Sequence, residues 1–357
     1  MLNRQSKYLT LSFILVISFL EVVAQQLPED FDYSPTYIRI PTTYVDSDFK
    51  VLKGEVVDDL QRKDTPAIIG TIATDSTHTT FTPLVQFDHD TPYTLIYNQH
   101  VFYFKIDRDE DELPLTVTGI YPNTKQVPAN ILKWYIEFSK PVNPVKIYDH
   151  IQFLDQDEEL IDRSILNLGA PLLSPDGKLL TVWVEPGRQK RLLGPNQHLG
   201  SVFESDRTYT LLVSNSLKDK QGMSMEASIS HSFTTIKPDR IKPSIQQWQV
   251  GEIPSGTVQP LVINCEEILD YGSLLDAISI NYEGKQIDGK LRYNSELKKI
   301  IYTPKESWQK GKYTINIEHQ LEDLAGNNLA YLFDRNIEDG NNEITQRAIE
   351  TLAFRCD

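Results

Sequence analysis

Hydrophobic and polar residues alternate along much of this chain with the period of a β-strand. In the clearest stretch, Leu132, Trp134, Ile136 and Phe138 are separated by single residues such as Lys133. A period of two places one set of side chains on a single face of a sheet. Beyond the first 24 residues, no stretch keeps the helical spacing of apolar positions over three turns. The pattern therefore predicts an all-β fold.

One phrase of strand, turn and strand occurs three times. Its second strand begins with tyrosine, threonine and an apolar residue, at Tyr93, Tyr209 and Tyr313. In two copies an aspartate- and glycine-containing turn follows, at 219–222 and 323–327. Repetition at this spacing predicts tandem β-domains. We interpret each tyrosine as an inward side chain with its hydroxyl at the sheet edge, and each aspartate as a turn residue that hydrogen-bonds its own backbone.

These phrases resemble bacterial immunoglobulin-like domains of the kind found in S-layer and other exported surface proteins. The segment 136–142, which reads Ile-Glu-Phe-Ser-Lys-Pro-Val, is similar to a strand of that family, as are the Tyr-Thr strands and the turns that close them. The resemblance implies tandem immunoglobulin-like β-sandwiches. It implies little about activity, because this fold hosts many unrelated functions. The cysteine–tryptophan–cysteine spacing of antibody domains is missing.

Composition changes and proline-rich stretches predict the domain boundaries. The clearest boundary is a linker at 236–243, whose two prolines favour an extended joint. The first domain is short for a sandwich, with one or two strands missing or borrowed. The predicted parts are a signal peptide (1–24), a leader (25–36), a partial immunoglobulin-like domain (37–106), a sandwich (114–235), the linker (236–243) and a second full sandwich (244–357).

The first residues have the pattern of a secretory signal. Arg4 and Lys7 precede an uncharged apolar run from Leu9 to Leu20, and Ala24 provides a small residue before the expected cleavage point. The run is too short to cross a bilayer of about 30 Å as a helix. We expect an exported protein, periplasmic, at the cell surface or secreted, with no transmembrane segment in the mature chain. An uncleaved anchor is the alternative.

The chain is acidic, with a formal net charge of −15. Such a surface repels phosphates, so nucleic acid is not an expected partner. One basic cluster stands out in an insertion at 187–196, which contains Arg188, Lys190 and Arg191. A loop on a rigid sheet that carries cations is a candidate site for an anionic ligand. The alternative is a solvated irregular loop.

The two cysteines, Cys265 and Cys356, each end a strand-like segment in the last third of the chain. In an exported protein such a pair predicts one disulfide, which would tie the last strand of the domain to an early one. Two free thiols are the alternative.

Catalytic motifs are missing from the sequence. It contains no His-Glu-x-x-His, Gly-x-Ser-x-Gly, phosphate loop or Cys-x-x-Cys, and its histidines are dispersed. We therefore expect a protein that is not an enzyme and has no cofactor. Calcium is the alternative, either at the acidic segment 107–112 or at Glu322, Asp323, Asn327 and Asn328.

The function predicted from these observations is a non-enzymatic interaction or spacer module of the cell envelope or surface. Its expected partner is a protein or a glycan at the envelope. The alternatives are a carbohydrate-binding accessory module and a hydrolase with an unrecognised site. Of the tryptophans that would stack on sugar, Trp134 and Trp183 are in phase with apolar neighbours and are expected in the core, which leaves Trp248 and Trp308.

Overall fold

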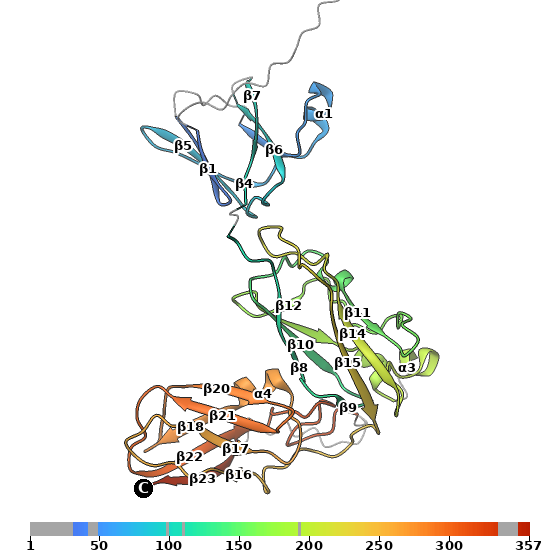
Figure 1. Cartoon of the computed structure of the whole chain (residues 1–357), viewed down its shortest axis with the longest axis vertical. Coiled ribbons are helices and arrows are strands. Elements are labelled where there is room, and N and C mark those ends of the chain that lie inside the picture. The colour runs from blue at the N-terminus through green and yellow to red at the C-terminus, as the bar shows by residue number, and fades with distance from the viewer. Residues whose placement is uncertain (1–30, 42–48, 98–99, 109–110, 192–193, 335–348) are drawn as a thin grey trace, which may run out of the picture. The chain divides into compact units, whose positions relative to one another are not determined.

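The computed structural model describes residues 31–41, 49–97, 100–108, 111–191, 194–334 and 349–357. Within them the regular structure is mainly β-strand, arranged in mostly antiparallel sheets, as the alternating pattern predicts (Figure 1). The predicted signal peptide and the first half of the predicted leader, residues 25–30, lie outside the described residues. Within the described residues no helix is both long and apolar enough to cross a membrane. The chain divides into two compact units, with the boundary after Arg108.

The first unit is a small sandwich of a four-stranded and a three-stranded sheet. Aromatic side chains fill its core, where Phe87 contacts both Tyr93 and Phe104. One sheet has the order β1 (Asp32–Ser34), β2 (Tyr37–Pro41), β5 (His78–Pro83), β4 (Gly70–Thr74), and the other has β3 (Lys50–Lys53), β6 (Pro92–Tyr97), β7 (His100–Lys105); a short helix α1 spans Asp59–Asp64.

The second unit contains two full sandwiches, each with its own hydrophobic core. The earlier sandwich has the sheets β12 (Leu172–Leu173), β13 (Leu179–Trp183), β10 (Lys133–Phe138), β8 (Val117–Tyr121) and β11 (Ile151–Leu154), β14 (Thr208–Val213), β15 (Ile229–Ile236), β9 (Gln126–Pro128), with η2 (Ile147–His150), α2 (Pro186–Gln189) and α3 (Gly194–Leu199). We call it the middle sandwich.

The later sandwich, which we call the C-terminal sandwich, follows the same plan. Its sheets are β16 (Gln249–Val250), β17 (Leu261–Asn264), β21 (Lys299–Pro304), β20 (Gly289–Asn294) and β19 (Lys285–Gln286), β18 (Ile278–Tyr282), β22 (Gly311–Glu318), β23 (Ile349–Cys356), with the helix α4 (Tyr271–Ala277).

The repeated tyrosine has one structural role in all three sandwiches. Each ring is buried, and each hydroxyl accepts a backbone N–H from a residue four or five positions earlier. The oxygen–nitrogen distances are 2.7 Å from Tyr93 to Asp88, 2.9 Å from Tyr209 to Glu204 and 2.7 Å from Tyr313 to Gln309. The tyrosine therefore holds the loop that precedes its strand, and its interpretation as a structural residue is confirmed.

The repeated aspartate holds the closing turn in the two full sandwiches. Oδ1 of Asp219 accepts the backbone N–H groups of Gln221 and Met223. Oδ1 of Asp323 accepts the backbone N–H groups of Ala325 and Asn327, which are also two and four residues later in the chain. Gly222 and Gly326 adopt positive φ angles of 86° and 76° in these turns, a conformation that favours glycine. The repeat is thus a device for building strands and turns.

The alternation around Trp134 is confirmed, but the prediction that Trp183 lies in the core is wrong. Trp134 is fully buried. In the register of β10 and β13 it lies opposite Val182, whereas Trp183 lies opposite Lys133 on the other face of the sheet. The ammonium of Lys133 sits 5.0 Å from the centre of the Trp183 ring. An apolar neighbourhood in sequence did not distinguish the two faces, because cross-strand register decides them.

The predicted disulfide is not formed. Both thiols are free and buried. Cys265 follows β17 at the end where Asn264 pairs with Lys299, and its N–H donates to the carbonyl of Lys298. Cys356 pairs with Gly311, the first residue of β22. Gly311 comes shortly after Pro304, the last residue of β21, whereas Cys265 lies beside the residue that precedes β21. The two cysteines therefore lie at opposite ends of the sandwich, and six-residue β21 spans about 17–20 Å, beyond the reach of a disulfide.

Candidate functional site

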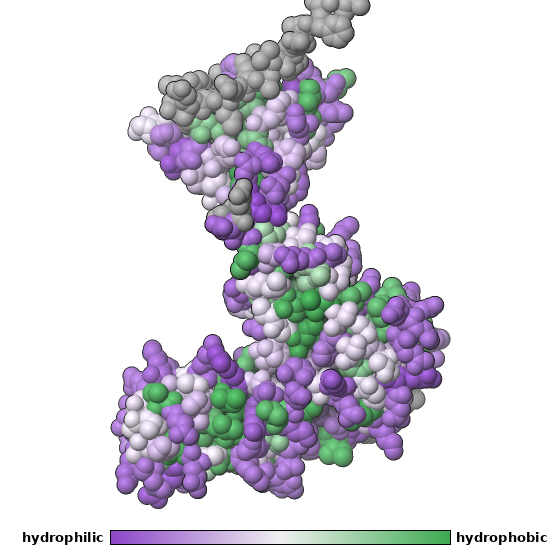
Figure 2. All heavy atoms as spheres, in the orientation of Figure 1, coloured by the Kyte–Doolittle hydropathy of each residue, from purple (hydrophilic) through white to green (hydrophobic). Residues whose placement is uncertain are grey.

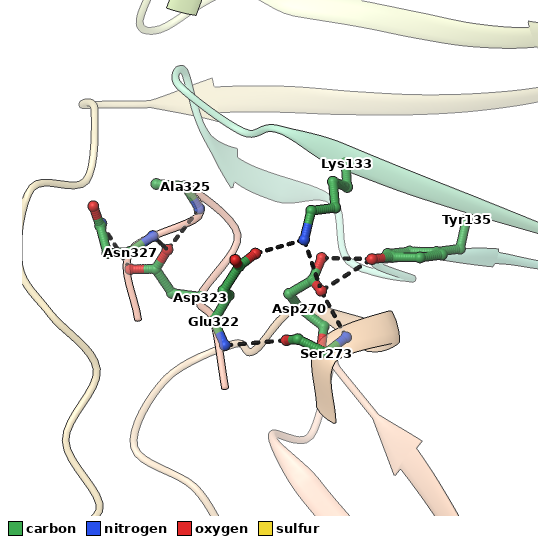
Figure 3. Close-up of polar contacts among 8 residues, drawn as sticks. All are labelled: Lys133, Tyr135, Asp270, Ser273, Glu322, Asp323, Ala325 and Asn327. Carbon is green, nitrogen blue, oxygen red and sulfur yellow. Dashed lines mark hydrogen bonds and ion pairs between the residues drawn. The ribbon is translucent and has the colours of Figure 1, made fainter. Parts of the chain in front are cut away.

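The most elaborate polar arrangement in the described residues lies where the two sandwiches of the second unit meet. Figure 3 shows Lys133 and Tyr135 on β10 of the middle sandwich pointing toward Asp270 and Glu322 of the C-terminal sandwich. We call these four side chains the junction cluster. Asp270 is the N-cap of α4, and Glu322 belongs to the repeated closing turn. Because residues 133 and 135 alternate with the core positions 134 and 136, they face outward from their own sandwich.

Lys133 joins both acidic groups. Its Nζ is 2.5 Å from Oε2 of Glu322 and 3.3 Å from Oδ2 of Asp270. The side chains of Lys133 and Asp270 are only 11% and 3% exposed. Burial by itself lowers the pKa of Lys133, but the charges of Asp270 and Glu322 outweigh it, so the pKa is raised. The lysine therefore stays cationic between two carboxylates.

Tyr135 completes the cluster. Its hydroxyl is 2.9 Å from both carboxylate oxygens of Asp270, and Oδ2 also accepts the backbone N–H of Ser273. Burial, followed by the charge of Asp270, raises the pKa of Tyr135 far above its usual value. The phenol is therefore a neutral donor. Its ring lies against Gly272, where an added Cβ would come within 2.5 Å of the Tyr135 hydroxyl.

Apolar contacts extend the cluster. The rings of Tyr121 and Tyr271 stack with centroids 4.1 Å apart and an angle of 6° between their planes. Leu324 belongs to the hydrophobic core of the middle sandwich, although its chain segment lies in the C-terminal one. Its carbonyl accepts the N–H of Leu132 at 2.9 Å. The two sandwiches thus share part of a core as well as an ion-pair network.

The side chains of the basic insertion at 187–196 also contact other parts of the chain. The guanidinium of Arg188 is buried and donates to backbone carbonyls, among them those of Asp162 and Ser201. Lys190 lies 4.4 Å from the centre of the Phe333 ring, and Nε of Arg191 is 2.6 Å from Asp334. The three predicted ligand-binding cations therefore have partners within the chain, and two of them contact the C-terminal sandwich.

Three other carboxylates converge beside the junction cluster. One oxygen each of Asp239, Glu267 and Asp323 lies within 4.8 Å of the others, a grouping that could hold a metal ion. Burial raises the pKa of Asp323 to about 7, and the charge of Asp239 adds to the effect. Burial also raises the pKa of Glu267. Asp323 already accepts hydrogen bonds from Ala325 and Asn327, so its turn is complete as it stands.

The four residues named for calcium at the turn 322–328 make hydrogen bonds and ion pairs within the chain. Glu322 faces Lys133, and Oδ1 of Asn328 accepts the N–H groups of Ala330 and Tyr331. Asn327 directs its amide nitrogen, a donor, at Asp323. In the acidic segment 107–112, Asp107 pairs with Lys105 and Glu112 with Lys140, while residues 109 and 110 lie outside the described residues.

No sequence pattern predicted the junction cluster. Lys133 was named only as a residue between apolar positions and Glu322 only as a calcium alternative, and no role was predicted for Tyr135 or Asp270. The hydrogen bonds of Lys133 join positions 137 and 189 residues apart. The available signal was that Lys133 and Tyr135 face outward between buried positions. Such an outward face can contact a second domain, but the alternation does not identify the residues that it contacts.

Comparisons with known proteins give weak similarities. A scan of family models finds no matching family, and a search of curated proteins finds no match. Among solved structures, the N-terminal part of the bacterial S-layer protein SbsC is 15% identical over 57% of this chain and 40% of that one, with a TM-score of 0.24. The titin I9–I11 tandem is 12% identical over 78% of this chain and 87% of that one, with a TM-score of 0.20.

Dimeric latent PorU from Porphyromonas gingivalis is also similar, with 10% identity over 90% of this chain and 31% of that one and a TM-score of 0.23. This chain therefore spans less than half the length of the SbsC fragment and of PorU. Similarities at this level identify no family. The tandem β-sandwich fold is established by the sheets themselves.

Proposed function

We propose that this protein is an exported, non-enzymatic module of the cell envelope or surface, and that its second unit acts as a rigid spacer and interaction arm. The observation that carries the proposal is the junction cluster, in which Lys133 links Asp270 and Glu322 across two sandwiches. Buried ion pairs require one geometry, because a displaced partner leaves a charge without compensation. A joint of this kind holds two domains at a fixed angle.

The other contacts between the sandwiches support the same conclusion. The linker residue Asp239 exchanges hydrogen bonds with Asn130, through its N–H and its carbonyl. At another point Asn123 donates its N–H to Ser295. Together with the contacts of Lys190 and Arg191, these interactions brace the joint at several separate places. Interfaces between domains that move freely are usually smaller and less connected.

The surface agrees with a module that works in solvent. Figure 2 shows a mainly hydrophilic face interrupted by separate apolar patches. Three of the four tryptophans, Trp134, Trp248 and Trp308, are buried, and the ring of Trp183 lies below Lys133. Sugar-binding surfaces need an aromatic face that a ring can stack on. The placement of these tryptophans favours a spacer or protein-binding role over the carbohydrate-binding alternative.

A distance measurement on the full chain tests the rigid arm. Spin labels are placed at Gln156→Cys and Lys285→Cys, both exposed positions, one in each sandwich. The native thiols are buried and react slowly by comparison. We expect one narrow distance distribution in pulsed electron paramagnetic resonance, and a broader one when Lys133→Met is added. A broad distribution in the otherwise native chain would contradict the proposal.

A further inference from the structure

The strand β4 forms an open edge of the first unit. Within the described residues it pairs only with β5, so its other side carries backbone groups without a strand partner. All five residues, Gly70 to Thr74, are exposed. Edge strands of this kind bind other strands unless charges, prolines or bulges block them. This one reads Gly-Thr-Ile-Ala-Thr and contains neither a charge nor a proline.

The side of β4 that faces the core is also uncovered. Ile72 lies opposite Phe81, which lies opposite Ile38, so these three side chains share one face of the sheet. Phe81 and Ile38 are 4% and 0% exposed, but Ile72 is 52% exposed. The facing sheet has three strands against the four of this one. The first sandwich therefore carries an exposed isoleucine at its edge.

More apolar surface lies at one end of β4. Ile69, Leu84 and Val85 are each at least 70% exposed. The N–H of Leu84 donates to the carbonyl of Ile69 at 2.8 Å, which places these two residues side by side, and alternation along the strands puts them on the opposite face of the sheet from Ile72. Exposed apolar residues that cluster along an unpaired edge indicate a binding surface. The backbone edge and the side chains call for the same kind of partner, an extended strand.

We propose that β4 pairs antiparallel with β4 of a second copy of this chain, about a two-fold axis at Ile72. In this register Ile72 faces its own symmetry mate, Thr71 faces Ala73, and Gly70 faces Thr74. Pairs of β-branched or small residues directly opposite each other are compatible with a sheet. A two-fold axis requires a surface that complements itself, and this strand fulfils that condition.

Charge bears on the contact surface and on the orientation of the two strands. Each copy carries −15, and β4 contains no charged residue, so two copies can meet along it without bringing charged side chains of this strand together. The nearest acidic residue in sequence, Asp75, directly follows β4. Antiparallel pairing about Ile72 places the two Asp75 residues six strand positions apart, about 20 Å along the sheet. That exceeds the Debye length of about 8 Å at physiological salt. Parallel pairing would set the two carboxylates side by side.

Sedimentation equilibrium of the full chain over a range of concentrations tests the proposal. We expect a reversible dimer that Ile72→Lys weakens by at least about tenfold, because two lysines would then face each other across the pair. Ile241→Lys is the matched control, since Ile241 is 77% exposed in the second unit. Circular dichroism checks that each variant folds. A chain that stays monomeric, or a dimer that Ile72→Lys leaves unchanged, would overturn the proposal.

Cross-linking tests the register independently. Residues directly opposite in an antiparallel pair have Cα atoms about 4.5–5.5 Å apart, within disulfide range. Ile72→Cys should therefore give a covalent dimer on mild oxidation, while Ile241→Cys should not. Cys265 and Cys356 are buried and contribute little background. Failure of Ile72→Cys to cross-link in a sample that sediments as a dimer would exclude this register.

Discussion

Replacing Lys133 by methionine tests the central claim about the junction cluster. Methionine keeps most of the length and volume of the side chain but removes the charge. Asp270, which is 3% exposed at its side chain, and Glu322 would then face each other without the cation between them. We expect the second unit to lose stability and the two sandwiches to separate more easily.

The free energy of unfolding that Lys133→Met should lose follows from the burial of the junction cluster. Removing one partner of a buried ion pair costs about 3–5 kcal/mol, because the remaining charge is left in a poorly solvated site. Glu322 is 26% exposed, so water can relieve part of its loss. We therefore expect about 3 kcal/mol. With a urea dependence of about 1–3 kcal/mol per molar, the midpoint should fall by about 1 M or more.

Tryptophan fluorescence during urea unfolding of the full chain reports on the second unit alone, since all four tryptophans lie between residues 134 and 308. The matched control is Lys305→Met. Its pair with Asp288 is 4.0 Å long and both side chains are more than 70% exposed, so we expect a change within about 0.5 kcal/mol.

A compensated variant separates charge from packing. If Lys133→Met destabilises by leaving buried charges, then adding Asp270→Asn and Glu322→Gln should recover part of the loss. The reasoning is refuted if Lys133→Met shifts the midpoint no more than Lys305→Met does. It is also refuted if the triple variant is less stable than the single one by a further 3 kcal/mol or so, because packing and hydrogen bonds would then dominate.

Three further predictions concern single residues. Tyr313→Phe should lower the stability of the C-terminal sandwich by about 1–3 kcal/mol in urea unfolding, because the N–H of Gln309 loses its buried acceptor; no change would contradict the loop-holding role. Gly272→Ala should broaden the distance distribution between the two sandwiches, since its Cβ would clash with Tyr135, and an unchanged distribution would mean that the interface can repack. Burial lowers the pKa of His231 in the folded protein, so the unfolded chain binds the proton more readily and the stability present above pH 6.5 should be lost as the pH falls. Comparing the free energy of unfolding of the native chain and of His231→Gln at pH 7 and pH 5 isolates this effect. Parallel pH profiles of the two proteins would refute it.

The strands and turns of this protein depend on neighbouring residues, whereas its strand register depends on distant ones. The strand around Trp134, the inward tyrosines and the aspartate turns were predictable, because each depends on residues within a few positions of one another. The register between β10 and β13 was not, and that register placed Trp183 on the outer face. Alternation shows that a strand has two faces, but only its neighbours determine what each face contacts.

The sequence alone determined an acidic chain of repeated β-domains with a shared plan for strand and turn. Only the tertiary structure decided what the exceptional residues do. It placed the two cysteines at opposite ends of one sandwich, gave the basic insertion partners within the chain, and brought Lys133 to carboxylates 137 and 189 residues away. The physical reason is that a pattern of period two is encoded locally, whereas an ion pair between sandwiches depends on how two complete folds dock.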